Sequence, residues 1–111
     1  MRWFLVLLPA IRKVKYSYAN PIFDQLQRAA LSVQLNIAEA YALKTSKRFR
    51  NHLDIAYGSA VESAELLELS GDLHLLSTEL TTPTLERCRR CQRLLRASSI
   101  IFAWPEYRLS H

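Results

Sequence analysis

The sequence predicts an all-α protein, an up-and-down antiparallel four-helix bundle that residues 1–111 form as a single domain. Two observations favour this fold class. Half of the 111 residues are hydrophobic, whereas only 2 are glycine and 4 are proline, so the chain has few places to turn. Between these turns, apolar residues recur every three or four positions, which is the period of an amphipathic helix. A few long helices are therefore expected rather than many short strands.

Caps and breakers place the first two helices. A short or irregular helix is expected over residues 3–18, broken or bent near Pro9, which lacks the N–H of a helical hydrogen bond. Asn20 is a suitable N-cap and Pro21 fits the first turn after it. A second helix should therefore run from about Pro21 to Leu43.

The third helix should begin at Thr45 or Ser46, either of which can cap it, and run to about Ser70. Gly71 then fits the left-handed position that ends many helices. One face of this helix is apolar and rich in small residues, and it should face the core: Phe49, Leu53, Ala56, Tyr57, Ala60, Ala64 and Leu67.

The fourth helix should follow a connection over residues 73–83. Thr82 and Pro83 begin it, and it should reach about Ala103, with Pro105 beyond its end. Its core face has the alternating three-and-four spacing of a bundle seam: Cys88, Cys91, Leu95, Ser98 and Phe102.

The stretch QLQRAALSVQLNIAEA, residues 25–40, carries two apolar faces. One is suited to the core: Leu26, Ala29, Ala30, Val33, Ile37 and Ala40. The opposite face of this helix is also apolar. On the third helix, some apolar residues likewise lie outside the core face. Because a large exposed apolar patch is a liability for a monomer, these residues predict a subunit interface: Leu31, Leu35, Ala38, Ile55 and Leu66.

A polar row separates the two faces of the second helix: Gln25, Arg28, Ser32, Asn36 and Glu39. Small, uncharged side chains among apolar neighbours favour a buried or half-buried hydrogen-bond network that fixes the register between helices or protomers. The alternative is an ordinary solvated stripe.

Arginines dominate the outward side of the fourth helix. Arg89, Arg93 and Arg96 align at helical spacing with Arg90 beside them, and guanidinium groups suit bidentate contacts with phosphate. The net charge of +5 is compatible with an anionic partner such as RNA or DNA, although it also aids solubility. In the alternative interpretation, these arginines pair with an acidic stripe on the third helix: Asp54, Glu65, Glu68 and Asp72.

Patterns that carry catalysis or bind metals are missing from the sequence. It has no Gly-rich phosphate loop, no G-x-S-x-G and no H-E-x-x-H, and no Glu stands three residues before His52 or His74, as a di-metal bundle would need. Cys88 and Cys91 fall within a core seam, where cysteine acts as a small hydrophobe. We therefore expect a non-enzymatic, cytoplasmic protein without cofactor, metal or membrane span.

Two stretches resemble a known family. The pattern Q-L-x-R-A-x-x-S-x-x-x-N-I-A-E, matched from Gln25 to Glu39, precedes a helix that matches L-x-I-A-x-G-S-x-x-E from Leu53 to Glu62. Together they resemble the four-helix-bundle proteins encoded in intervening sequences of bacterial 23S ribosomal RNA genes. Ala40 stands where that family usually has glycine, which predicts a helix that continues smoothly.

The resemblance implies a compact bundle that assembles into a homopentameric ring. The family is also similar to the accessory variability determinants of diversity-generating retroelements, which are basic pentamers that bind nucleic acid and a reverse transcriptase. It carries no catalytic residues over to this chain. The leading hypothesis is thus a homo-oligomer that binds RNA or DNA through its arginine surface, and the alternative is a protein-interaction scaffold without nucleic-acid binding.

Overall fold

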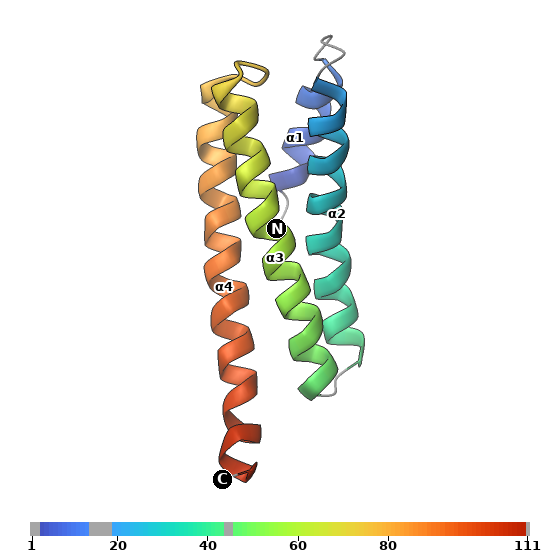
Figure 1. Ribbon diagram of the computed structural model, residues 1–111, viewed down its shortest axis with the longest axis vertical. Helices are drawn as coiled ribbons and strands as arrows, with labels where there is room; N and C mark the ends of the chain where they lie inside the picture. The colour runs from blue at the N-terminus through green and yellow to red at the C-terminus, as the bar shows by residue number, and fades with distance from the viewer. Residues whose placement is uncertain (1–2, 14–18, 44–45, 111) are drawn as a thin grey trace.

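The computed structural model describes residues 3–13, 19–43 and 46–110, and this part of the chain contains helices but no strands. Its helices are α1 (Trp3–Arg12), α2 (Asn20–Leu43), α3 (Ser46–Asp72) and α4 (Thr78–Ser110) (Figure 1). The predicted all-α class is confirmed, and α2 begins and ends within one residue of its predicted bounds.

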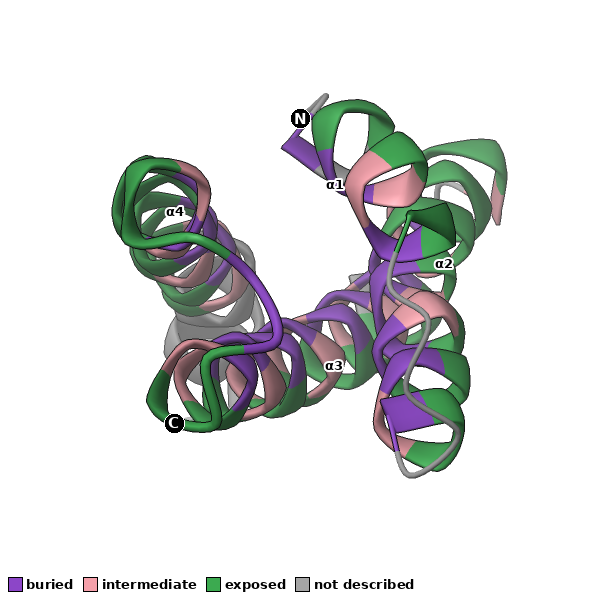
Figure 2. Cartoon of the chain, turned by 90° about the horizontal axis from the view of Figure 1, so that it is seen from above, coloured by how far each residue is buried: buried purple, intermediate pink, exposed green. Residues whose placement is uncertain are grey.

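Helix α3 lies at the centre, packed against α2 on one side and α4 on the other (Figure 2). The short helix α1 contacts both α2 and α4, but only along the upper part of the bundle in Figure 1. The buried faces of the helices turn toward one another and contribute to one core cluster that includes Leu7, Leu26, Val33, Leu53, Leu67 and Cys88.

The core faces predicted for α2, α3 and α4 are confirmed for the side chains that the structure describes. Ile37, Tyr57 and Ser98 are half-buried at the edges of these faces, and the other predicted members are buried. Phe102 lies where the structure describes no side chains. Small residues bring α4 close to α3: Ala56 and Ala60 are fully buried, and the Ala60 carbonyl accepts hydrogen bonds from Cys88 Sγ and Gln92 Nε2, both at 3.2 Å.

The first helix is shorter than predicted, and of the expected break or bend near Pro9 the break is wrong. Helix α1 continues through Pro9 and ends at Arg12, while residues 14–18 lie outside the described part. Trp3, Leu7 and Ile11 are all buried at a spacing of four residues. This packing holds the helix against the core on both sides of the proline, whose ring is exposed.

The predicted cap at Gly71 is also wrong. Among the described residues, the left-handed backbone conformation is found at His74, which has a φ of 57°. Gly71 instead lies inside α3. The N–H of His74 donates to the carbonyl of Gly71, and the N–H of Leu75 donates to that of Ser70, which is the Schellman pattern. Leu75, the last residue of this motif, is buried. The burial of Leu75, rather than the position of Gly71, therefore determines where the helix ends.

Helix α4 begins earlier and ends later than predicted. Ser77 stands at its N-terminus, where its carbonyl accepts the N–H groups of Leu80 and Thr81, so the connection spans only residues 73–77. Pro83 and Pro105 therefore lie within the helix. A proline inside a helix removes one hydrogen bond, and here this loss does not end the helix.

Candidate functional site

The predicted polar row of α2 faces α3 and is hydrogen-bonded to it. Gln25 Nε2 donates to Glu62 Oε1, and the hydroxyl oxygens of Ser32 and Ser59 lie 2.7 Å apart. These partners run in opposite order along the two helices, so α2 and α3 are antiparallel. A hydroxyl pair has the direction and short reach that fix the register of two helices.

Asn36 is the most connected residue of this row. Its amide nitrogen donates to the carbonyl and the hydroxyl of Ser32, at 2.9 and 3.1 Å, and its amide oxygen accepts from His52 Nδ1 at 2.9 Å. Arg28 and Glu39 belong to the same row but are exposed, and neither bonds to another described residue. The network therefore comprises Gln25, Ser32 and Asn36, without the two charged members of the prediction.

The α3 members of the network were not identified from the sequence. His52, considered above only as a metal ligand, is half-buried against α2. Ser59 and Glu62 stand in the second family-like stretch, and Gln25, Ser32 and Asn36 stand in the first. His52, Ser59 and Glu62 stand at helical spacings of seven and three residues, and this polar row is the signal that could have placed them on one face of α3.

The second apolar face of α2 is open to solvent in the single chain. Leu31 and Leu35 are 54% and 55% exposed, Ala38 is exposed beside them, and Ile55 on α3 is 51% exposed. Leu66 differs from the other predicted interface residues, because it is half-buried and packs against the core cluster. Four of the five predicted interface residues are thus exposed apolar side chains.

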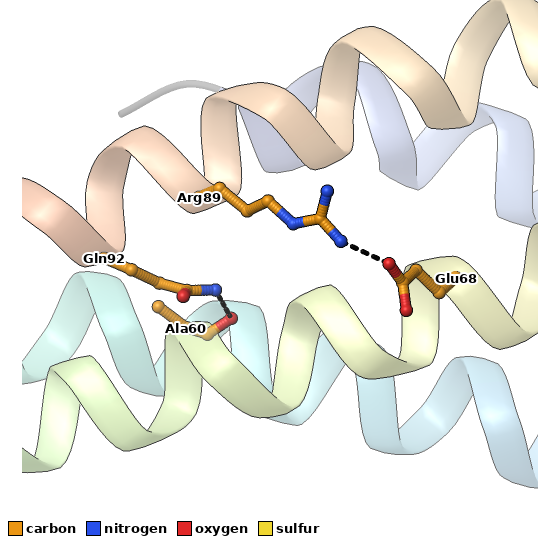
Figure 3. Close-up of polar contacts among 4 residues, drawn as sticks. All are labelled: Ala60, Glu68, Arg89 and Gln92. Atoms are coloured by element: carbon orange, nitrogen blue, oxygen red, sulfur yellow. Dashed lines mark hydrogen bonds and ion pairs between the residues drawn. The ribbon is translucent and has the colours of Figure 1, made fainter.

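The arginines of α4 fall into two groups. Arg89 forms an ion pair with Glu68 of α3 (Figure 3), and both side chains remain about half exposed. Arg96 lies over the ring of Tyr57, with 5.8 Å between its guanidinium carbon and the ring centroid, and donates to the phenol oxygen at 3.3 Å. These contacts hold both guanidinium groups against α3.

Arg90 and Arg93 are exposed and bond to no other described residue. The acidic stripe of α3 pairs with the arginines only through Glu68, among the residues that the structure describes. Asp54 instead accepts a hydrogen bond from Ser99 at 2.8 Å. The predicted internal pairing therefore accounts for one of the four predicted arginines, and Arg90 and Arg93 remain without a hydrogen bond or ion pair among the described residues.

The two cysteines are buried in the core. Burial raises the pKa of the Cys88 thiol to about 12, the proximity of Cys91 adds to this effect, and burial likewise raises the pKa of Cys91. A thiol of raised pKa is a poor nucleophile and a poor metal ligand at neutral pH. Their position agrees with the structural role expected from the sequence.

The described residues contain neither a metal-binding cluster nor a helix that could cross a membrane. No three His, Cys, Asp or Glu side chains of this part lie close enough together to hold a metal ion. Within the same ranges, no helix combines the length and the apolar character that crossing a membrane requires.

These features define an all-α protein in which a central helix is hydrogen-bonded to one neighbour and carries arginines of the other on its flank. The family model described as 23S rRNA-intervening sequence protein matches residues 10–97. The chain therefore belongs to the 23S rRNA-intervening sequence protein family. No curated protein and no solved structure matches the chain.

Proposed function

We propose that this protein is a non-enzymatic homo-oligomer of up-and-down antiparallel four-helix bundles that binds RNA or DNA through the arginine surface of α4. One observation carries the proposal: Arg90 and Arg93 are exposed and unbonded within the described part, beside Arg89 and Arg96, which α3 holds in place. Positioned guanidinium groups lose less conformational freedom when they bind phosphate.

The exposed apolar face of α2 supports the oligomer. Leu31 and Leu35 lie opposite the buried face of the same helix, and Leu31 also borders an apolar pocket of about 190 Å³ formed with Leu7, Leu8 and Ala30. Apolar surface beside such a pocket suits the contact of a second copy. In a ring of copies, for which the family resemblance favours five, each arginine surface is repeated and the linked sites bind together.

The nucleic-acid interface is tested by replacing Arg90 and Arg93 together with alanine. Each phosphate contact contributes about 0.9 to the slope of log K against log salt, so the double variant should lower that slope by about 2 for each bound subunit. The matched control replaces Lys47 and Arg48, two exposed residues of α3, and removes the same charge. Equal slopes for the two double variants would refute the assignment to α4.

The subunit interface is tested with Leu31→Glu and Leu35→Glu, measured by light scattering after size exclusion. Each substitution places a charge on a desolvated surface, so the assembly should dissociate toward the 12.8 kDa chain. Leu69→Glu is the matched control, because Leu69 is similarly exposed on α3. An unchanged mass for both α2 variants would contradict the proposed interface.

The ion pair between Arg89 and Glu68 supports a second candidate, a cytoplasmic protein-interaction scaffold whose arginines are neutralised internally. Its partner would be a protein, for which the family resemblance suggests a reverse transcriptase. This candidate predicts no salt-dependent binding to RNA or DNA. The same titration of wild-type protein with single-stranded RNA and duplex DNA therefore separates the two candidates.

A further inference from the structure

An apolar groove lies below α1, between the lower parts of α2 and α4. With 10 residues, α1 is about 15 Å long, whereas the 24 residues of α2 span about 36 Å. Helix α1 therefore covers the space between α2 and α4 over only part of their length (Figure 1). The groove continues this space, with Ile37 and Tyr41 on one wall and Cys91, Leu94 and Leu95 on the other.

The groove has the size and rigidity of an anchor site for one apolar side chain. Its volume is about 160 Å³, and a cavity of roughly 150 Å³ holds a molecule such as benzene. Leu53 lies at its floor and is buried, whereas Leu94 and Tyr41 at its walls are 60% and 61% exposed. The Tyr41 ring rests edge-on against buried Phe49, with centroids 5.2 Å apart, which holds that wall in place.

Two arginines of α4 stand on the groove side of this helix. Arg87 precedes Cys91 by one helical turn and Arg90 precedes Leu94 by one turn, so both stand on the groove side of α4. No aspartate or glutamate stands three or four positions from any residue that lines the groove. An occupant with carboxylates on its flank would therefore be favoured over a basic one.

We propose that this groove binds an amphipathic helix of a partner protein, which inserts one bulky apolar side chain and places carboxylates against Arg87 and Arg90. One end of the groove is at α1, so a partner helix bound in the groove would lie in line with α1 along the bundle. A second copy of this chain fits less well. Half of its 10 acidic residues lie on α3, whose core face is already buried, and each copy carries a net charge of +5.

The probes are two synthetic peptides of about 14 residues, which is the length of an ordinary helix. Both carry leucines at alternating three-and-four spacing, and they differ only in having glutamate or lysine on the flanks. Binding of the labelled peptides to the full chain is followed by fluorescence anisotropy. We expect the glutamate peptide to bind about tenfold more tightly than the lysine peptide. Equal affinities, or no binding of either peptide, would overturn the proposal.

Three variants locate the binding site. Leu94→Glu should weaken the glutamate peptide about tenfold, and the double change Arg87→Glu with Arg90→Glu should make the lysine peptide the preferred one. Leu69→Glu, on an exposed part of α3 away from the groove, should leave the affinity unchanged. Circular dichroism checks that each variant is folded. We expect all of them to fold, because the substituted side chains are exposed.

The protein without peptide gives the remaining outcome. If Leu94→Glu lowers the mass of the assembly in sedimentation, the groove is an interface between copies and the partner-helix proposal fails. If the mass is unchanged and the peptide affinity falls, the proposal stands. Because Arg87 lies outside the proposed nucleic-acid surface, Arg87→Glu alone should weaken the glutamate peptide, whether or not RNA binds.

Discussion

Replacing Asn36 with alanine tests whether the polar row between α2 and α3 stabilises the fold. The change removes two hydrogen bonds to Ser32 and one from His52, with lengths of 2.9, 3.1 and 2.9 Å. Each such bond contributes about 0.5–1.5 kcal/mol net, and water can replace part of this at a half-buried site. We therefore expect the free energy of unfolding to fall by about 2 kcal/mol.

The loss is measured by urea unfolding at fixed protein concentration, since association of copies would also change the apparent stability. For a chain of this size, about 2 kcal/mol corresponds to a decrease in Tm of about 8 °C. Gln34→Ala is the control, because Gln34 is exposed on the same helix and bonds to no other described residue. A loss below about 0.5 kcal/mol, or one equal to that of the control, would show that the polar row does not stabilise the fold.

A double-mutant cycle isolates the bond between Asn36 and His52. If this bond stabilises the helix pair, the combined loss of Asn36→Ala and His52→Ala should be smaller than the sum of the single losses by about 0.5–1 kcal/mol. Strict additivity of the two substitutions would show that the bond contributes nothing to stability.

Three further predictions concern single side chains. Because the pKa of Cys88 is raised in the folded protein, the unfolded thiol loses its proton first, so the stability that this thiol contributes is complete below pH 9 and is lost as the pH rises toward 12. The urea midpoint should therefore decrease less over this range in Cys88→Ala than in the wild-type protein. Identical decreases in the two proteins would contradict this prediction. Gly58→Ala should raise the free energy of unfolding by about 0.5–1 kcal/mol, since nothing lies within 4 Å of the added methyl group, and a decrease would show that another chain covers it. Glu68→Gln should change stability by less than about 0.5 kcal/mol yet strengthen RNA binding, because it removes a negative charge beside the arginine surface; weaker RNA binding would count against this surface.

The sequence was most informative where one physical signal dominated. The Asn20-Pro21 pair marked the start of α2, and the apolar period identified the buried faces of α2, α3 and α4. These signals are local, or repeat over several turns, so tertiary contacts reinforce them.

Signals failed where a tertiary contact outweighed a local preference. Gly71 indicated a helix end, but the buried Leu75 placed the left-handed residue at His74. A methyl group at Gly71 would lie 3.4 Å from Thr81 Oγ1, which is an ordinary van der Waals contact, so the packing does not require glycine there. Likewise, Pro83 indicated a helix start, although Ser77 provides it one and a half turns earlier.

The candidate site was predicted in part for a similar reason. The residues of one helix face can be read from spacing, which gave Gln25, Ser32 and Asn36. Their partners Ser59 and His52 depend on the register between two helices, which spacing within one helix does not define. The division of the arginines into bonded and free groups depends on the same register between α3 and α4.

Size exclusion with light scattering and absorbance at two wavelengths tests the proposed function most directly, using protein purified without nuclease. We expect a multimer of the 12.8 kDa chain with excess nucleic-acid absorbance, and this absorbance should be lost when Arg90 and Arg93 are replaced with alanine. A 12.8 kDa monomer without bound nucleic acid would contradict both the subunit interface at Leu31 and Leu35 and the nucleic-acid surface of α4.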